Sequence, residues 1–208
     1  MIRSTLLAEG NSDRALLPIL NWLLAQVSSA PCAAVVWADF GAAGKPPTLS
    51  ARISAAIDLF PCDLLFVHRD ADKQPADWRY QEINAAQGGA TPLVCVVPIR
   101  TQEAWLLLDE GALRRAAGRP SGRNPLDLPP IARIEALGDP KGTLHDALRA
   151  AGELSGRRAA QFRAHDAAER LADLVQDWAP LRQLSAFRRL EMDLQAALSE
   201  LGGRGGEG

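Results

Sequence analysis

The feature that most constrains the fold is the apolar run of residues 64–67 (Leu-Leu-Phe-Val), which leads to two carboxylates, Asp70 and Asp72. Apolar residues without alternation are typical of a strand covered on both faces, as in a parallel sheet. Such a strand ends at the edge where open α/β sheets bind their ligands. In an extended chain residues i and i+2 point to the same side, so both carboxylates are expected to face one site. Oxygen ligands of this kind suit Mg²⁺, although Asp is also common in the turns that follow strands.

The start of the chain repeats this arrangement. A second apolar run, residues 2–8, leads into the turn 9–13 (Glu-Gly-Asn-Ser-Asp). Leucines then recur at the three-to-four spacing of an amphipathic helix, namely Leu16, Leu17, Leu20, Leu23 and Leu24. The pattern predicts a strand, an acidic turn and a helix over about residues 13–27, with Pro18 disturbing its first turns.

The turn with Glu9 and Asp13, followed by the pair Asp70 and Asp72, resembles the TOPRIM domain of type II topoisomerases, primases and several nucleases. The resemblance covers about residues 1–108. It implies an α/β fold with a four-stranded, mostly parallel sheet flanked by helices. It also implies that the carboxylates of these four residues meet around Mg²⁺ or Mn²⁺ ions.

In chain order, the other predicted strands and helices alternate through the first half. The strands are residues 3–8, 33–39, the run that carries the acid pair, and 92–98; the helices are residues 13–27, 48–60 and 75–87. Strands and helices that alternate at these lengths indicate right-handed crossovers and a parallel sheet.

After Pro98 the alternation stops and the pattern predicts helices alone. They span residues 101–117, 131–137, 141–151, 160–178 and 180–201, with a Gly- and Pro-rich loop at 118–130. We therefore expect an α/β domain over residues 1–108 and an α-helical C-terminal extension, 109–201, packed on it. The Gly-rich end, residues 202–208, is expected to be disordered.

Glu103 and Lys141 are two further candidates for the site. Glu103 lies in the segment 102–106 (Gln-Glu-Ala-Trp-Leu), which is similar to a subgroup of small TOPRIM-like proteins found beside ATPases in microbial defence gene clusters. Glu103 either faces the same metal or complements the dipole of a helix in its first turn. Lys141 stands at another helix start, where cations are unfavourable, and this suggests a contact with phosphate.

Electrostatics favour a metal at such a site. Two like charges about 4 Å apart repel by roughly 1 kcal/mol in water and about 4 kcal/mol at an effective dielectric constant near 20. The protein must therefore protonate an acid, supply a cationic side chain or bind a metal ion. Arg69 is the rival cation, placed where the family more often has an apolar or small residue. Because Arg69 alternates with Asp70 along the strand, it should point to the other face.

Composition limits the class of protein. The net charge of −2 provides no overall basic field for nucleic acid, so such contacts need a local patch or a partner. No segment approaches the roughly 20 apolar residues of a membrane helix, and the opening apolar run is too short for a secretory signal. The three cysteines lie in apolar surroundings and are expected to be buried thiols of a cytoplasmic protein.

The expected function is Mg²⁺-dependent hydrolysis of phosphodiester bonds in DNA or RNA, with Glu9 as a ligand or general base. The resemblance adds a role as effector of an antiphage defence system with an ATPase partner. A topoisomerase needs a nucleophilic tyrosine, and Tyr80, the single tyrosine, lacks a supporting context. Two alternatives remain: a non-catalytic TOPRIM-like subunit that docks on an ATPase, and a small RNA-processing maturase.

Overall fold

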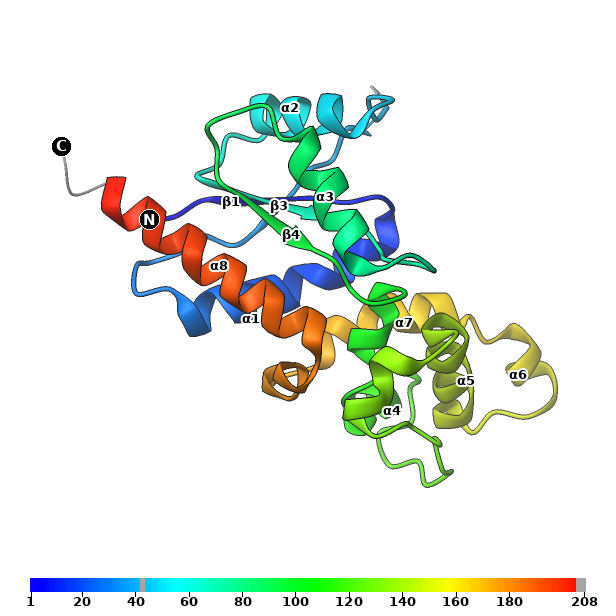
Figure 1. The fold of residues 1–208 in the computed structure, drawn as a ribbon. Helices are drawn as coiled ribbons and strands as arrows, with labels where there is room; N and C mark the ends of the chain where they lie inside the picture. Colours follow the sequence, from blue (N-terminus) through cyan, green and yellow to red (C-terminus); the bar gives the residue numbers. More distant parts are fainter. Residues whose placement is uncertain (42–43, 205–208) are drawn as a thin grey trace.

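Four parallel strands form one sheet in the order β2-β1-β3-β4 in the computed structural model, which describes residues 1–41 and 44–204 (Figure 1). The strands are β1 (Ser4–Leu7), β2 (Val36–Trp37), β3 (Leu64–His68) and β4 (Leu93–Val96). The predicted α/β fold is confirmed, and the sheet is entirely parallel in its paired strands. The strand expected at residues 33–39 is reduced to two residues on the edge of the sheet.

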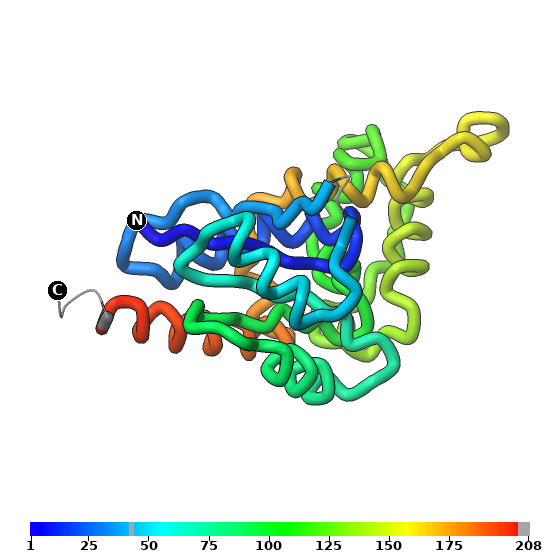
Figure 2. The backbone as a smooth tube through the Cα atoms, turned by 90° about the horizontal axis from the view of Figure 1, so that it is seen from above, coloured from blue at the N-terminus to red at the C-terminus, as the bar shows by residue number. Residues whose placement is uncertain are grey.

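Helices cover both faces of the sheet (Figures 1 and 2). On one face lie α1 (Leu16–Val27) and α8 (Ser185–Arg204), and on the other lie α2 (Leu49–Leu59) and α3 (Ala76–Ala86). Thr48 begins α2 by accepting a hydrogen bond from the N–H of Ala51 at 3.2 Å, which is a typical N-cap.

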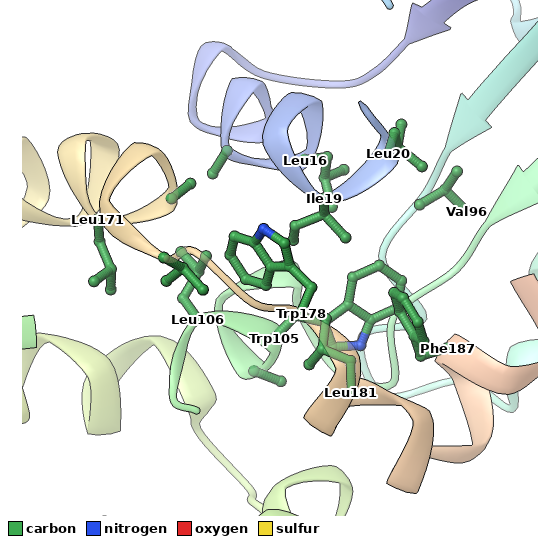
Figure 3. Packing of buried hydrophobic residues seen from close by; sticks show 14 of the residues in the cluster. Leu16, Ile19, Leu20, Val96, Trp105, Leu106, Leu171, Trp178, Leu181 and Phe187 are labelled. Carbon is green, nitrogen blue, oxygen red and sulfur yellow. The ribbon is translucent and has the colours of Figure 1, made fainter. Parts of the chain in front are cut away.

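Alternation along the strands divides the apolar side chains between two cores. Leu6 and Phe66 join the larger core with α1 and the helical half, whereas Leu7 and Val67 join the smaller core with α2 and α3. The larger core contains Trp105 and Phe187, whose rings meet edge-on with centroids 5.5 Å apart (Figure 3). This core is built from both halves of the chain, so the helical half is packed against the sheet.

The C-terminal half is helical, as predicted. Its elements are η3 (Gln102–Leu106), α4 (Glu110–Ala116), η4 (Ile131–Ala136), α5 (Pro140–Gly152), α6 (Gly156–Gln161), α7 (Ala164–Leu174), η5 (Ala179–Gln183) and α8. Residues 118–130 form no helix or strand, which confirms the predicted loop. In both views α4, α5 and α7 lie toward the carboxyl ends of the strands (Figures 1 and 2).

Several predicted helices are interrupted. The helix expected over 101–117 is divided into η3 and α4, because the side chain of Asp109 accepts a hydrogen bond from Ala112 N–H at 2.9 Å and begins a new helix. The helix expected over 160–178 is likewise divided into α6 and α7, and ends at Leu174. Helix α8 continues to Arg204, so residues 202–204 are helical and not disordered, while 205–208 lie outside the described residues.

The first helix begins later than its leucine pattern suggests. Residues Asn11–Ala15 form the 3₁₀ helix η1, and α1 follows at Leu16. Pro18 therefore falls in the first turn of α1, where its missing N–H would have no helical partner. The proline is thus compatible with a regular helix.

No helix in the described ranges is long and apolar enough to cross a membrane. The three thiols are free; Cys95 is buried as predicted, whereas Cys32 and Cys62 are only half-buried.

Candidate functional site

The two acidic motifs meet at the point where the strand order reverses. Strands β2 and β3 lie on opposite sides of β1, and helices α1 and α2 cover opposite faces, so the reversal falls between β1 and β3. Open α/β sheets bind ligands in the crevice beyond the carboxyl ends of such strands. Asp13 follows β1 and Asp70 follows β3, and both lie near the ring of His68. The predicted convergence of the two motifs is therefore observed for these two acids.

Glu9 points away from this pair because of the register between β1 and β3. Leu7 lies opposite Val67, so two residues further on Glu9 lies beside Arg69. Their side chains form an ion pair, with Arg69 Nε 3.0 Å from Glu9 Oε1. Arg69 does face away from Asp70, as predicted, but the Glu9 side chain lies on the same side as Arg69.

Three acids on the α2/α3 side of the carboxyl edge of the sheet are paired with arginines. We call this set the arginine-paired cluster; its members are Glu9, Arg69, Asp72, Arg79 and Glu82. Glu82 lies 3.1 Å from Arg69 and 3.0 Å from Arg79, which also lies 3.0 Å from Asp72. Each of its three carboxylates therefore has a guanidinium partner.

Asp72 joins this cluster because the chain turns after β3. The strand ends at His68, and Asp72 has a left-handed φ of 55°. The Nε of Arg79 donates to the carbonyl oxygen of Asp70 at 2.9 Å, which holds the turn against α3. The expectation that Asp70 and Asp72 continue an extended strand and face one site together is thus corrected.

On the opposite side lies a set with little compensating charge, which we call the carboxylate cluster: Asp13, His68, Asp70, Gln102 and Glu103. Asp70 Oδ1 accepts a hydrogen bond from the backbone N–H of Gln102 at 2.8 Å and lies 3.5 Å from His68 Nε2. The pKa of Asp70 is raised to about 8, first by burial and then by the nearby carboxylates of Asp13 and Glu103, against the opposing effect of the Gln102 N–H.

Asp13 closes the turn after β1. Its Oδ2 accepts hydrogen bonds from the N–H groups of Glu9 at 3.0 Å and Gly10 at 2.8 Å. Asp13 is only 6% exposed, so these hydrogen bonds to the turn are buried inside the protein. In the turn 9–13, Asp13 is therefore tied to the backbone, whereas Glu9 is turned toward α3.

The position of Glu103 is compatible with either interpretation given for it. It lies in the first turn of η3, and it is also buried close enough to Asp70 to raise that group's pKa. Lys141 Nζ lies 3.4 Å from Glu103 Oε1, so the structure brings the predicted lysine to the cluster. Asp139 caps α5 through the N–H of Gly142 at 2.8 Å, and a Cβ at Gly142 would collide with the Asp139 carboxylate. A larger residue at position 142 would therefore displace the carboxylate that caps α5.

His68 and Gln102 were not predicted as site residues. His68 is 1% exposed, and burial lowers its pKa. Gln102 is 2% exposed; its Nε2 donates to Ser12 O at 3.1 Å, but its Oε1 has no hydrogen-bond partner within the described chain. Strand alternation placed His68 on the side of Asp70 and offered a signal for it, whereas Gln102 had none.

The oxygen and nitrogen donors of the carboxylate cluster suit an open metal site better than a closed one. Among residues 1–41 and 44–204, no group of three or more His, Cys, Asp or Glu side chains is arranged to hold an ion. Mg²⁺, however, is commonly bound through one or two carboxylates, several waters and substrate phosphates. An uncompensated carboxyl at Asp70 and the unpartnered oxygen of Gln102 fit that mode of binding. They do not fit a closed cage of protein ligands.

On the side that faces α7, a small cavity reaches Gln102 and Glu103 of the cluster. A cavity of about 10 Å³, lined by Gln102, Glu103 and Ser12 among others, has room for about one water molecule. An open groove of about 540 Å³ between η1 and α7 shares Ser12 and Glu169 with this cavity. The groove is of the size of typical ligand sites.

No protein-family model, curated protein or solved structure matches the chain.

Proposed function

We propose that the protein is a TOPRIM-like, divalent-cation-dependent nuclease that hydrolyses phosphodiester bonds in DNA or RNA, with Mg²⁺ or Mn²⁺ bound at the carboxylate cluster. The observation that carries the proposal is the contrast at the switch point of the sheet. Glu9, Asp72 and Glu82 all have arginine partners, whereas Asp70 is partly buried next to Asp13 and Glu103. Strongly perturbed acids in a crevice are concentrated at functional sites.

The chemistry that a bound divalent ion would supply is polarisation of the phosphoryl oxygen and a lower pKa for the attacking water. Asp70 is the proposed direct ligand. Asp13 holds the turn after β1 in place through two backbone hydrogen bonds. Gln102 fixes Asp70 by donating its backbone N–H.

Glu103 takes the role of general base that the sequence suggested for Glu9. Glu9 is turned toward Arg69, and although its charge still reaches His68, Glu103 is the acid that acts on Asp70 itself. Glu103 is next to Asp70 and in contact with Lys141. The Lys141 side chain is 51% exposed and is the proposed contact for a substrate phosphate.

The test is cleavage of plasmid DNA and of single-stranded RNA by the purified chain with Mg²⁺, with Mn²⁺ and with EDTA. We expect cleavage that requires the cation and is lost in Asp70→Asn, prepared in parallel to exclude a contaminating nuclease. The preference for RNA or DNA would separate a maturase from a DNase. If neither substrate is cut with either ion, the nuclease proposal fails and the docking subunit becomes the better description.

A further inference from the structure

The ring of His68 is held in an orientation that directs its Nε2 toward two carboxylates. Its Nδ1 lies 3.0 Å from the carbonyl oxygen of Val96, which can only accept a hydrogen bond. In the neutral ring Nδ1 therefore carries the proton and Nε2 carries a lone pair. Histidines that bind metals are commonly oriented by this kind of hydrogen bond to a backbone carbonyl.

The lone pair of His68 points into the carboxylate cluster. Nε2 lies 3.5 Å from Asp70 Oδ1 and 3.8 Å from Asp13 Oδ2. All three atoms are electron-rich, and His68 is 1% exposed, so water does not separate them freely. An electron-rich nitrogen buried opposite carboxylate oxygens needs a cation or a proton between them.

The spacing suits two ligands of one ion. Ligands about 2.1 Å from a common ion lie roughly 3.0–3.4 Å apart in octahedral or tetrahedral geometry. The 3.5 Å between His68 Nε2 and Asp70 Oδ1 is within a few tenths of an ångström of that range. Asp13 Oδ2 already accepts two backbone N–H groups and is not needed as a third ligand. With two protein ligands, the remaining coordination positions of the ion would be left to water and substrate.

We propose that His68 Nε2 binds the divalent ion together with Asp70, and that the site therefore selects a transition-metal ion such as Mn²⁺ over Mg²⁺. Mg²⁺ prefers oxygen ligands, whereas imidazole favours first-row transition ions. This inference rests on the proposed function, because it assigns a second ligand and a metal preference to the same site. His68 also differs from the other two histidines, His145 and His165, in that it alone is fully buried beside Asp70.

The experiment uses Mn²⁺ alone as the probe on the full chain. Titration followed by electron paramagnetic resonance gives the Kd, and electron spin-echo modulation shows whether a nitrogen is bound directly to Mn²⁺. We expect nitrogen coupling in the wild-type protein and in His145→Gln and His165→Gln. In His68→Gln the coupling should disappear, with the Kd for Mn²⁺ raised at least about tenfold. The Kd for Mg²⁺, measured by competition, should change less than about threefold.

The wild-type spectrum decides the matter even if His68→Gln does not fold, which circular dichroism would show. Mn²⁺ that binds in an Asp70-dependent way without nitrogen coupling overturns the role of His68 and leaves the proposed function standing. Mn²⁺ binding that is unchanged by Asp70→Asn, or no binding at all, overturns both.

Discussion

At the carboxyl edge of the sheet, acidic residues on one side are paired with arginines, whereas those on the other side are not. The arginine-paired cluster sets Arg69 and Arg79 against Glu9, Asp72 and Glu82, at distances of 3.0–3.1 Å. Among the described residues, the only Lys or Arg side chain that pairs with an acid of the carboxylate cluster is Lys141, which lies beside Glu103. The arginines offset the charge of their acids within the protein, whereas Asp70 is left with a raised pKa. Acidic motifs that look alike in sequence therefore differ in the folded protein in how far their charges are compensated.

The largest effect should be the difference in cleavage rate between two single variants, each of which replaces one acid, from one cluster or the other, with its amide. Glu103→Gln should lower cation-dependent cleavage by about 10²–10³-fold, because it removes the proposed proton acceptor. Glu9→Gln is the matched control and should lower the rate by less than about threefold, since Glu9 lies with Arg69. Initial rates on one nucleic-acid substrate measure both. Equal losses in the two variants would mean that the clusters do not differ in function.

The next effect is on stability as a function of pH. Asp70 has a folded pKa of about 8 against an ordinary value of 3.8, so between these values the folded state holds a proton that the unfolded state has lost. The free energy of unfolding should therefore fall as pH rises from about 4 to 8. Because the Asp70 side chain is 21% exposed, we expect the fall to be about 2–3 kcal/mol.

Urea unfolding of wild type and Asp70→Asn across this pH range measures that difference. His68 is present in both proteins, so its own titration largely cancels in the comparison. The difference should be small near pH 4 and largest above pH 8, with the variant more stable. Parallel curves for the two proteins would show that Asp70 is not held protonated.

In the arginine-paired cluster, the ion pair of Arg69 and Glu9 should contribute modestly to the free energy of unfolding. Arg69→Met leaves Glu9 and Glu82 short of a partner and should destabilise the fold by about 1–2 kcal/mol. The Glu9 side chain is 41% exposed, so a double-mutant cycle with Glu9→Gln should give a coupling of about 0.5–1 kcal/mol. Urea unfolding at pH 7 supplies all four values. A coupling near zero would mean that Glu9 is not tied to Arg69 in solution.

The smallest effect concerns Lys141. Lys141→Met removes a positive charge beside Glu103 and should tighten Mn²⁺ binding by about two- to fivefold. Arg149→Met is the matched control: Arg149 is on the same helix but pairs with Asp146, so the affinity should stay the same. The electron paramagnetic resonance titration serves here too. Weaker Mn²⁺ binding in Lys141→Met would contradict the position of Lys141 next to the ion.

The apolar runs and helical spacings were sufficient to predict the parallel sheet, its covering helices and the helical second half. They also placed Asp70 at the carboxyl edge of the sheet and put Arg69 on the opposite side, because alternation is a property of a single strand. Helix boundaries in the second half were less well predicted, since caps such as Asp109 divide a continuous apolar pattern.

Only the tertiary structure decided which acids share a side. The register of Leu7 with Val67 carries Glu9 to Arg69, and α3 supplies the arginine that binds Asp72. Gln102 and Lys141 reach the cluster from segments packed against it much later in the chain. These contacts join residues far apart in sequence, and strand register is set by packing between strands, which no pattern along one strand contains.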